Sequence, residues 1–119
     1  MIKQIPSNEV EAYVKNNPQS ILLDVRTEEE WSVDGKPDGE KFGLKTYFLT
    51  IKDENFINEF KKLGIQQDQE ILTMCMAGVR SQEAAELLAE ENYNCLNISD
   101  GFLGNSENVG WKNSGLPCK

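Results

Sequence analysis

Short apolar runs along the chain alternate with segments whose apolar residues recur at helical spacing. The runs predict buried strands over 21–24, 44–51, 70–74 and 93–98. The helically spaced segments predict helices over 7–17, 53–64 and 81–91, with a further short helix after Thr27. Strands that alternate with helices form mainly parallel sheets with right-handed connections and helices on both faces. We therefore expect an α/β fold in a single domain over residues 1–119.

Residue types that favour helix ends mark several of these boundaries. Ser7 and Asp53 suit N-cap positions, and Thr27 followed by Glu30 matches a capping box. The stretch 34–43 is rich in glycine and proline, which is typical of a loop.

The composition is that of an ordinary globular protein. Of the 119 residues, 27% are charged and 39% are hydrophobic, which argues against disorder. No apolar run approaches the roughly 20 residues that a membrane-spanning helix needs. Residues 1–6 also lack the apolar core of a secretory signal. We therefore expect a soluble, cytoplasmic protein with no membrane partner.

Charge and reactive residue types restrict the chemistry further. A net charge of −8 without a basic patch disfavours nucleic acid as a partner. The chain has no histidine, which excludes Ser-His-Asp and Cys-His mechanisms and every histidine metal site. Its three cysteines, Cys75, Cys95 and Cys118, include no C-x-x-C pair and make a poor disulfide framework. We expect no metal and no cofactor, so any nucleophile must be activated without an imidazole.

Cys75 has the surroundings expected of an activated cysteine. It directly follows the predicted strand 70–74, and a predicted helix begins near Arg80, five residues later. A tight turn of this kind directs successive backbone N–H groups inward and makes an anion-binding nest, to which the helix dipole adds positive potential. Such a nest favours a cysteine in its thiolate form. Arg80 adds a planar group that suits oxyanions.

The position of Cys75 in the predicted fold supports this interpretation. Both Asp24 and Cys75 fall at the carboxyl ends of predicted strands, where ligands of parallel sheets bind. Cys95, by contrast, lies inside a predicted strand, and we expect it to be a buried apolar residue as free cysteines commonly are. The loop that would hold a bound sulfur consists of Met76, Ala77, Gly78, Val79 and Ser81.

The length of the loop separates two kinds of cysteine chemistry. Protein tyrosine phosphatases place an arginine six residues after the cysteine, which makes a ring wide enough for phosphate. Here the sixth residue is Ser81 and Arg80 is the fifth, so the shorter ring fits a single sulfur atom better. A phosphatase also needs a general acid, for which Asp34 and Asp38 are the loop candidates. A Cys-dependent phosphatase or arsenate reductase is therefore the second hypothesis.

Three segments resemble signatures of the single-domain rhodanese (sulfurtransferase) family, over most of the chain. They are 22–31, which contains Asp24 and Arg26; 75–81, which is followed by two alanines; and the closing pair 100–102 and 111–117. The resemblance implies a rhodanese-like domain that works by double displacement. Cys75 would take a sulfane sulfur from a donor such as thiosulfate and pass it, as a persulfide, to a thiol or to cyanide. Arg80 would bind the oxyanion of the donor.

The resemblance also implies supporting roles and partners. Asp24 would accept hydrogen bonds near the Cys75 loop, and Arg26 would pair with a carboxylate such as Glu30. The implied partners are a small sulfur donor and a thiol acceptor, which for some members is a protein. A non-catalytic module that regulates or delivers sulfur to a partner protein is the third hypothesis. Segment 35–40 departs from the Gly-His-Ile-Pro-Gly-Ala motif of many members, so the resemblance does not extend to the substrate entrance.

Overall fold

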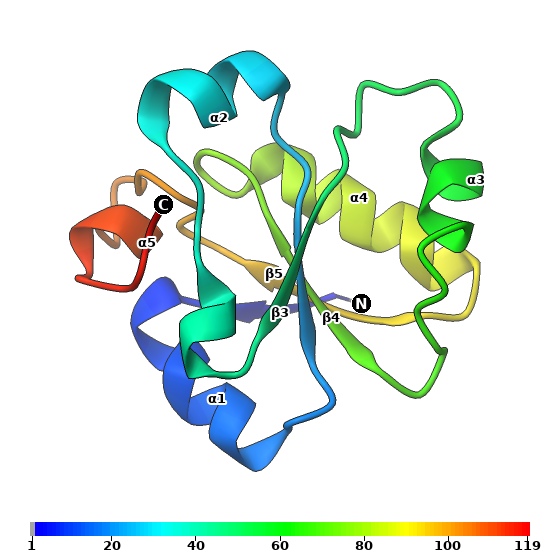
Figure 1. Ribbon diagram of the computed structural model, residues 1–119, viewed down its shortest axis with the longest axis horizontal. Coiled ribbons are helices and arrows are strands. Elements are labelled where there is room, and N and C mark those ends of the chain that lie inside the picture. Colours follow the sequence, from blue (N-terminus) through cyan, green and yellow to red (C-terminus); the bar gives the residue numbers. More distant parts are fainter. Residues whose placement is uncertain (1) are drawn as a thin grey trace.

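The computed structural model describes residues 2–119 and contains one five-stranded sheet surrounded by short helices (Figure 1). The strands are β1 (Lys3–Ile5), β2 (Ile21–Asp24), β3 (Lys45–Phe48), β4 (Glu70–Met74) and β5 (Asn94–Ile98). The α-helices are α1 (Val10–Asn16), α2 (Glu28–Asp34), α3 (Phe56–Lys61), α4 (Val79–Glu90) and α5 (Gly110–Asn113). Two short 3-10 helices, η1 (Ser7–Glu9) and η2 (Gly39–Phe42), complete the regular structure.

All neighbouring strands of the sheet run parallel, in the order β1-β5-β4-β2-β3. Strand β4 lies at the centre, and β1 and β3 are the outer strands. In the register of β2 with β4, Asp24 lies beside Met74, so the chain leaves both strands at the same edge of the sheet. The first residue beyond β4 is Cys75, which therefore lies at the carboxyl edge next to the end of β2.

The two faces of the sheet are covered by different helices, so the α/β prediction with helices on both faces is confirmed. Helices α1 and α5 contribute Val10, Val14 and Trp111 to the core on one face. Helices α3 and α4 contribute Phe60, Leu88 and their neighbours to the core on the other face. Alternate residues of β2 point into the two cores, which explains why its apolar run is uninterrupted.

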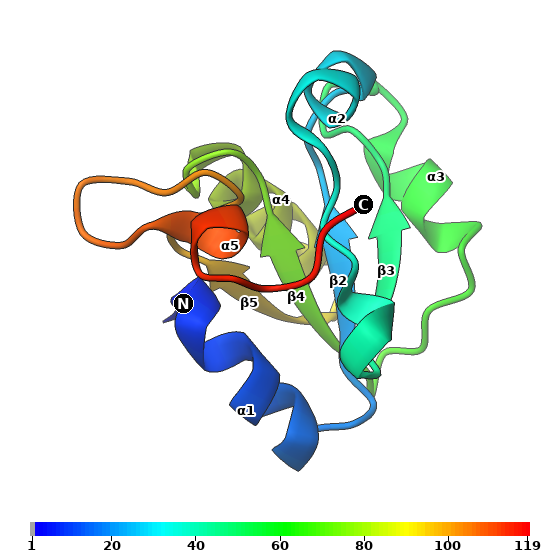
Figure 2. The same cartoon turned by 60° about the vertical axis from the view of Figure 1, so that its left-hand side comes forward.

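Helix α2 stands at the carboxyl edge and begins with the predicted capping box. The Thr27 hydroxyl accepts a hydrogen bond of 3.2 Å from the amide of Glu30, and the Glu30 carboxylate accepts one of 3.0 Å from the amide of Thr27. Beyond this helix the chain lies beside the C-terminal tail (Figure 2), where Lys36 and Lys119 exchange two backbone hydrogen bonds of 2.8 Å. Residues 34–43, which the sequence predicts to be a loop, are thus tied down by the tail and include η2.

Several helix and strand ends differ from the predictions. Strand β1 has only three residues and no apolar run, so nothing in the local pattern predicted it. Ser7 does not cap a helix with its side chain; its hydroxyl donates to the buried Asp100 carboxylate at 2.8 Å. Asp53 precedes α3 by three residues and accepts a hydrogen bond from the amide of Asn55, so the helix is shorter than 53–64. Within residues 2–119, no helix is both long and apolar enough to cross a membrane.

Candidate active site

The backbone after β4 is fixed by hydrogen bonds from the turn that follows β5. The amide of Phe102 donates to the carbonyl of Cys75 at 2.8 Å, and the amide of Leu103 donates to the carbonyl of Met76 at 3.1 Å. These two carbonyls therefore face the neighbouring turn. The first two residues of the loop that joins β4 to the N-terminus of α4 are thus held by the turn after β5.

Gly78 is the residue that lets this loop close. Its φ is +104°, in the region where side chains cause strain, and an added Cβ would run into the backbone of Ser99. The amide of Gly78 donates a hydrogen bond of 3.1 Å to the sulfur of Cys75. The predicted nest thus supplies one amide to the sulfur within the described residues, at the N-terminus of α4.

A second polar contact to the sulfur comes from Ser81. Its Oγ lies 3.2 Å from Cys75 Sγ and 2.5 Å from Asn97 Oδ1. The amide nitrogen of Asn97 donates to the carbonyl of Gly78 at 3.0 Å and to Gln4 Oε1 at 2.8 Å, so its oxygen must face Ser81. Asn97 on β5 therefore supports two residues of the loop. Asn97 was not among the residues predicted from the sequence, although a polar residue in a strand beside β4 was an available signal.

The sulfur of Cys75 is covered by this loop, and the residue is only 1% exposed. In the same loop Met76 is half-buried, and Val79 at the start of α4 is 79% exposed. The other two cysteines have different surroundings. Burial raises the pKa of the Cys95 thiol to about 12, which disfavours its thiolate, and Cys118 lies exposed in the tail. Within residues 2–119, no group of three or more cysteine, aspartate or glutamate side chains is placed to bind a metal ion.

Arg80 is brought to the same edge, but its guanidinium is already paired. Its two terminal nitrogens donate to the two carboxylate oxygens of Glu30 at 2.7 and 2.8 Å, in a bidentate geometry. These hydrogen bonds lower the pKa of Glu30 to about 2 and raise the pKa of Arg80. An oxyanion bound to Arg80, as predicted from the sequence, would therefore either displace Glu30 or use the other N–H groups of Arg80 beside the Glu30 carboxylate.

Asp24 and Arg26 form a buried pair below the loop. Both side chains are fully buried, and Arg26 Nη2 donates to Asp24 Oδ2 at 2.7 Å. The same nitrogen donates to the carbonyl of Gly35 at 3.0 Å, and the guanidinium lies 4.2 Å from the centre of the Phe102 ring. The expected pairing of Arg26 with Glu30 is wrong. Arg26 points inward and pairs with Asp24, and Glu30 pairs with Arg80 instead. A supporting role for both residues stays a prediction.

An open cavity of about 370 Å³ adjoins the Arg80–Glu30 pair at the base of α2. Three acidic and two basic side chains line it, together with two uncharged ones. The lining residues are Glu29, Glu30, Asp34, Lys52, Arg80, Thr27 and Val33. The geometry thus combines a shielded sulfur, one amide and one hydroxyl at that sulfur, and a neighbouring cavity whose lining carries one more negative than positive side chain.

Comparison with known proteins relates this arrangement to one family. Residues 7–108 match the family model described as the rhodanese-like domain. An uncharacterised protein of Rickettsia prowazekii (strain Madrid E) is 40% identical over 104 residues, which cover 85% of this chain and 84% of the relative.

Solved structures show the same fold. The crystal structure of Rv0390 from M. tuberculosis has a TM-score of 0.84 and 28% identity, covering 98% of this chain and 96% of that one. A protein of unknown function from Rhodopseudomonas palustris CGA009, described as a possible tyrosine phosphatase, has a TM-score of 0.66 and 19% identity. The likeness covers 99% of this chain and 85% of that one, and at this identity it indicates the fold alone.

Proposed function

Because the chain belongs to the rhodanese-like domain family, we propose that it is a sulfurtransferase that carries a sulfane sulfur on Cys75. The observation that carries this proposal is the position of the Cys75 sulfur, 3.1 Å from the Gly78 amide and 3.2 Å from the Ser81 hydroxyl, at the N-terminus of α4. Hydrogen-bond donors and a helix N-terminus both stabilise negative charge on sulfur. They supply this activation without a histidine.

The proposed reaction is a double displacement. The Cys75 thiolate attacks the sulfane sulfur of the donor, a new S–S bond forms, and the bond between that sulfur and the rest of the donor breaks. The electron pair of the broken bond leaves with the donor remnant, which is sulfite when the donor is thiosulfate. An acceptor thiolate then attacks the outer sulfur of the Cys75 persulfide and returns Cys75 as a thiolate. No oxidant is needed, because each step exchanges one sulfur bond for another.

Burial of Cys75 fits the second step. A persulfide has two sulfur atoms, and attack on the inner one would release the sulfane sulfur as sulfide and trap the acceptor on Cys75. The inner sulfur is the Cys75 Sγ, whose residue is only 1% exposed. The loop therefore shields the unproductive position, and the acceptor is directed to the outer sulfur.

The test is to load the protein with sulfur donors and measure its intact mass. Incubation with thiosulfate or cysteine persulfide should add one sulfur atom, which peptide mapping places on Cys75. Cys75→Ser should lose the added mass, whereas the matched variants Cys95→Ser and Cys118→Ser should keep it. Failure of every donor, or loading that survives in Cys75→Ser, contradicts the proposal.

A phosphatase or arsenate reductase has weaker support. The Cys75-to-Arg80 spacing is one residue short of the phosphatase ring, and Arg80 is held by Glu30. Hydrolysis of an aryl phosphate that is lost in Cys75→Ser would favour that alternative. A sulfur-delivery module would instead hold a Cys75 persulfide that only a partner protein can unload.

A further inference from the structure

We propose that Glu30 is a specificity-determining residue that keeps Arg80 from binding a donor dianion, so that the donor is a thiol-bound persulfide rather than free thiosulfate. This inference rests on the proposed sulfur transfer and deepens it by naming the class of donor. It starts from the bidentate pair in which the Glu30 carboxylate accepts a hydrogen bond from each terminal nitrogen of Arg80.

The carboxylate of Glu30 is held from two directions. Besides the two hydrogen bonds from Arg80, it accepts one of 3.0 Å from the amide of Thr27 and closes the capping box of α2. With a pKa of about 2, Glu30 stays ionised at any physiological pH. An oxyanion that approaches Arg80 must therefore either break this bidentate pair or bind the N–H groups that do not donate to Glu30, with an ionised carboxylate beside its own negative charge in both cases.

The charges around the pair add to this barrier. The side chains that line the cavity beside Arg80 carry a net charge of −1. They include three acidic residues, Glu29, Glu30 and Asp34, and two basic residues, Lys52 and Arg80. The whole chain carries a net charge of −8. Thiosulfate brings two negative charges into this field, whereas a persulfide group brings one at most. Electrostatic repulsion therefore discriminates against the dianion.

A persulfide donor does not need a free guanidinium. The Cys75 thiolate attacks the outer sulfur of R–S–SH, the S–S bond of the donor breaks, and R–S⁻ leaves with the electron pair while the transferred sulfur keeps its proton. The groups that face the Cys75 sulfur, the Gly78 amide and the Ser81 hydroxyl, are uncharged donors that suit this exchange. The exposed Val79 beside them offers an apolar contact for the donor's carbon chain.

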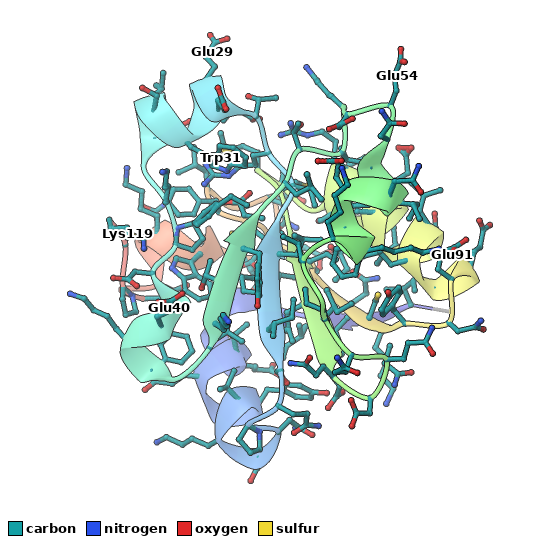
Figure 3. All side chains as sticks on the ribbon, turned by 45° about the vertical axis from the view of Figure 1, so that its right-hand side comes forward. Glu29, Trp31, Glu40, Glu54, Glu91 and Lys119 are labelled. Atoms are coloured by element: carbon teal, nitrogen blue, oxygen red, sulfur yellow. The ribbon has the colours of Figure 1, made fainter. Side chains whose placement is uncertain are left out.

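The test compares Glu30→Gln with its matched control Glu29→Gln. Both variants remove one negative charge from the same cavity, but only Glu30 contacts Arg80, while Glu29 points outward from α2 (Figure 3). Glutamine also suits the third position of a capping box, so Glu30→Gln should keep α2. The donors are thiosulfate and cysteine persulfide, and the readout is the rate at which Cys75 gains sulfur over a range of donor concentrations.

Glu30→Gln should lower the thiosulfate KM about tenfold, because it releases charge-assisted hydrogen bonds of Arg80 for the dianion. Glu29→Gln should change that KM by less than about twofold, as expected for a screened surface charge. Loading from cysteine persulfide should change little in Glu29→Gln, and in Glu30→Gln the preference for persulfide over thiosulfate, measured as the ratio of the two kcat/KM values, should fall. Sulfate, an unreactive dianion, should inhibit persulfide loading in Glu30→Gln and not in the wild type.

Three results would overturn the inference. An unchanged thiosulfate KM in Glu30→Gln, with persulfide loading intact, refutes the role of Glu30 and leaves the sulfurtransferase proposal standing. Strong inhibition of persulfide loading by sulfate in the wild type also refutes the role of Glu30, because a dianion would then bind although the Glu30–Arg80 pair is present. A wild-type protein that gains no sulfur from either donor overturns both proposals.

Discussion

At the scale of single residues, the Cys75 sulfur shares a neighbouring hydroxyl, which has one proton, with a second acceptor. Ser81 lies within hydrogen-bond distance of both Cys75 Sγ and Asn97 Oδ1, and the Asn97 oxygen can only accept. With Cys75 as a thiol, Ser81 donates to Asn97 and accepts from the S–H group. With Cys75 as a thiolate, the hydroxyl must share its proton between the sulfur and Asn97.

We predict that Ser81→Ala slows sulfur loading of Cys75 about tenfold. A hydrogen bond to a charged group is worth about 1.5–3 kcal/mol, and competition from Asn97 places this one at the low end. The measurement is the rate of mass gain with cysteine persulfide. Ser20→Ala is the matched control, because Ser20 is a buried serine before β2 whose hydroxyl has no partner. A Ser81→Ala rate within twofold of the wild type would remove Ser81 from the mechanism.

Gly78 should tolerate no side chain. We predict that Gly78→Ala lowers the free energy of unfolding by about 2 kcal/mol or more, since strain at positive φ adds to a clash with the Ser99 backbone. Gly64→Ala is the control: its φ is +75° but its Cβ would meet nothing within 4 Å, so about 1 kcal/mol is expected. Urea unfolding of the two variants measures both losses of unfolding free energy. Equal losses would mean that the Ser99 contact does not matter.

Sequence reasoning identified the candidate nucleophile and its loop but not the partners of the two arginines. Residue type and spacing are enough to place Cys75 and Arg80 at a strand-to-helix turn. They do not decide which arginine meets Glu30, because both reach the carboxyl edge. The choice depends on burial: Arg26 turns into the interior beside Asp24 and Phe102, which leaves Glu30 to Arg80. Whether Cys75 and Arg80 act in catalysis stays a prediction.

At the scale of elements, one ion pair joins helix α2 to helix α4. Glu30 lies in the first turn of α2 and Arg80 in the first turn of α4, and their side chains are 23% and 30% exposed. Helix α2 buries none of its residues fully, and its polar attachments include this pair, the capping box and a hydrogen bond of 2.8 Å from Lys112 Nζ to the carbonyl of Asp34. The position of α2 should therefore depend on the ionisation of Glu30.

We predict a specific pH dependence for this attachment. The pKa of Glu30 falls from its ordinary 4.5 to about 2 on folding, so the pair stabilises the fold fully above pH 4.5 and is lost as the pH falls through 2. Solvent screens a pair of this exposure, which limits its value to about 1 kcal/mol. Urea unfolding should give a difference between the wild type and Glu30→Gln that is constant from pH 5 to 7 and about half as large at pH 3. If the stability difference between the wild type and Glu30→Gln grew as the pH fell, the predicted direction of the pH dependence would be wrong.

The elements that the sequence predicted well are those determined by local pattern. Strands β2 and β4 have the predicted bounds, because each is a short apolar run that ends at a polar residue or at the loop. Strand β1 and helix α5 were missed, because distant contacts stabilise them. Strand β1 exists through its pairing with β5, and α5 is held by the fully buried Trp111, whose ring nitrogen donates to the carbonyl of Pro117.

At the scale of the whole molecule, the net charge of −8 should govern encounters with small anions. We predict that kcat/KM for thiosulfate rises about two- to threefold between 20 and 200 mM sodium chloride, because salt screens repulsion over a Debye length of about 10 Å. The kcat/KM for cysteine persulfide should rise less over the same range of salt, because this donor carries less negative charge than thiosulfate. A rate that falls with salt would show that a positive local field at Arg80 outweighs the rest of the chain.

The two outer strands of the sheet have a consequence for crowded solutions. Among residues 2–119, strands β1 and β3 each have one side without a neighbouring strand, and each begins with an exposed lysine, Lys3 or Lys45. A second molecule that tried to extend the sheet would have to bring its backbone against an ammonium group and strip that group of water. Strand-to-strand stacking between copies, the usual beginning of β-rich aggregates, is therefore opposed at both ends of the sheet.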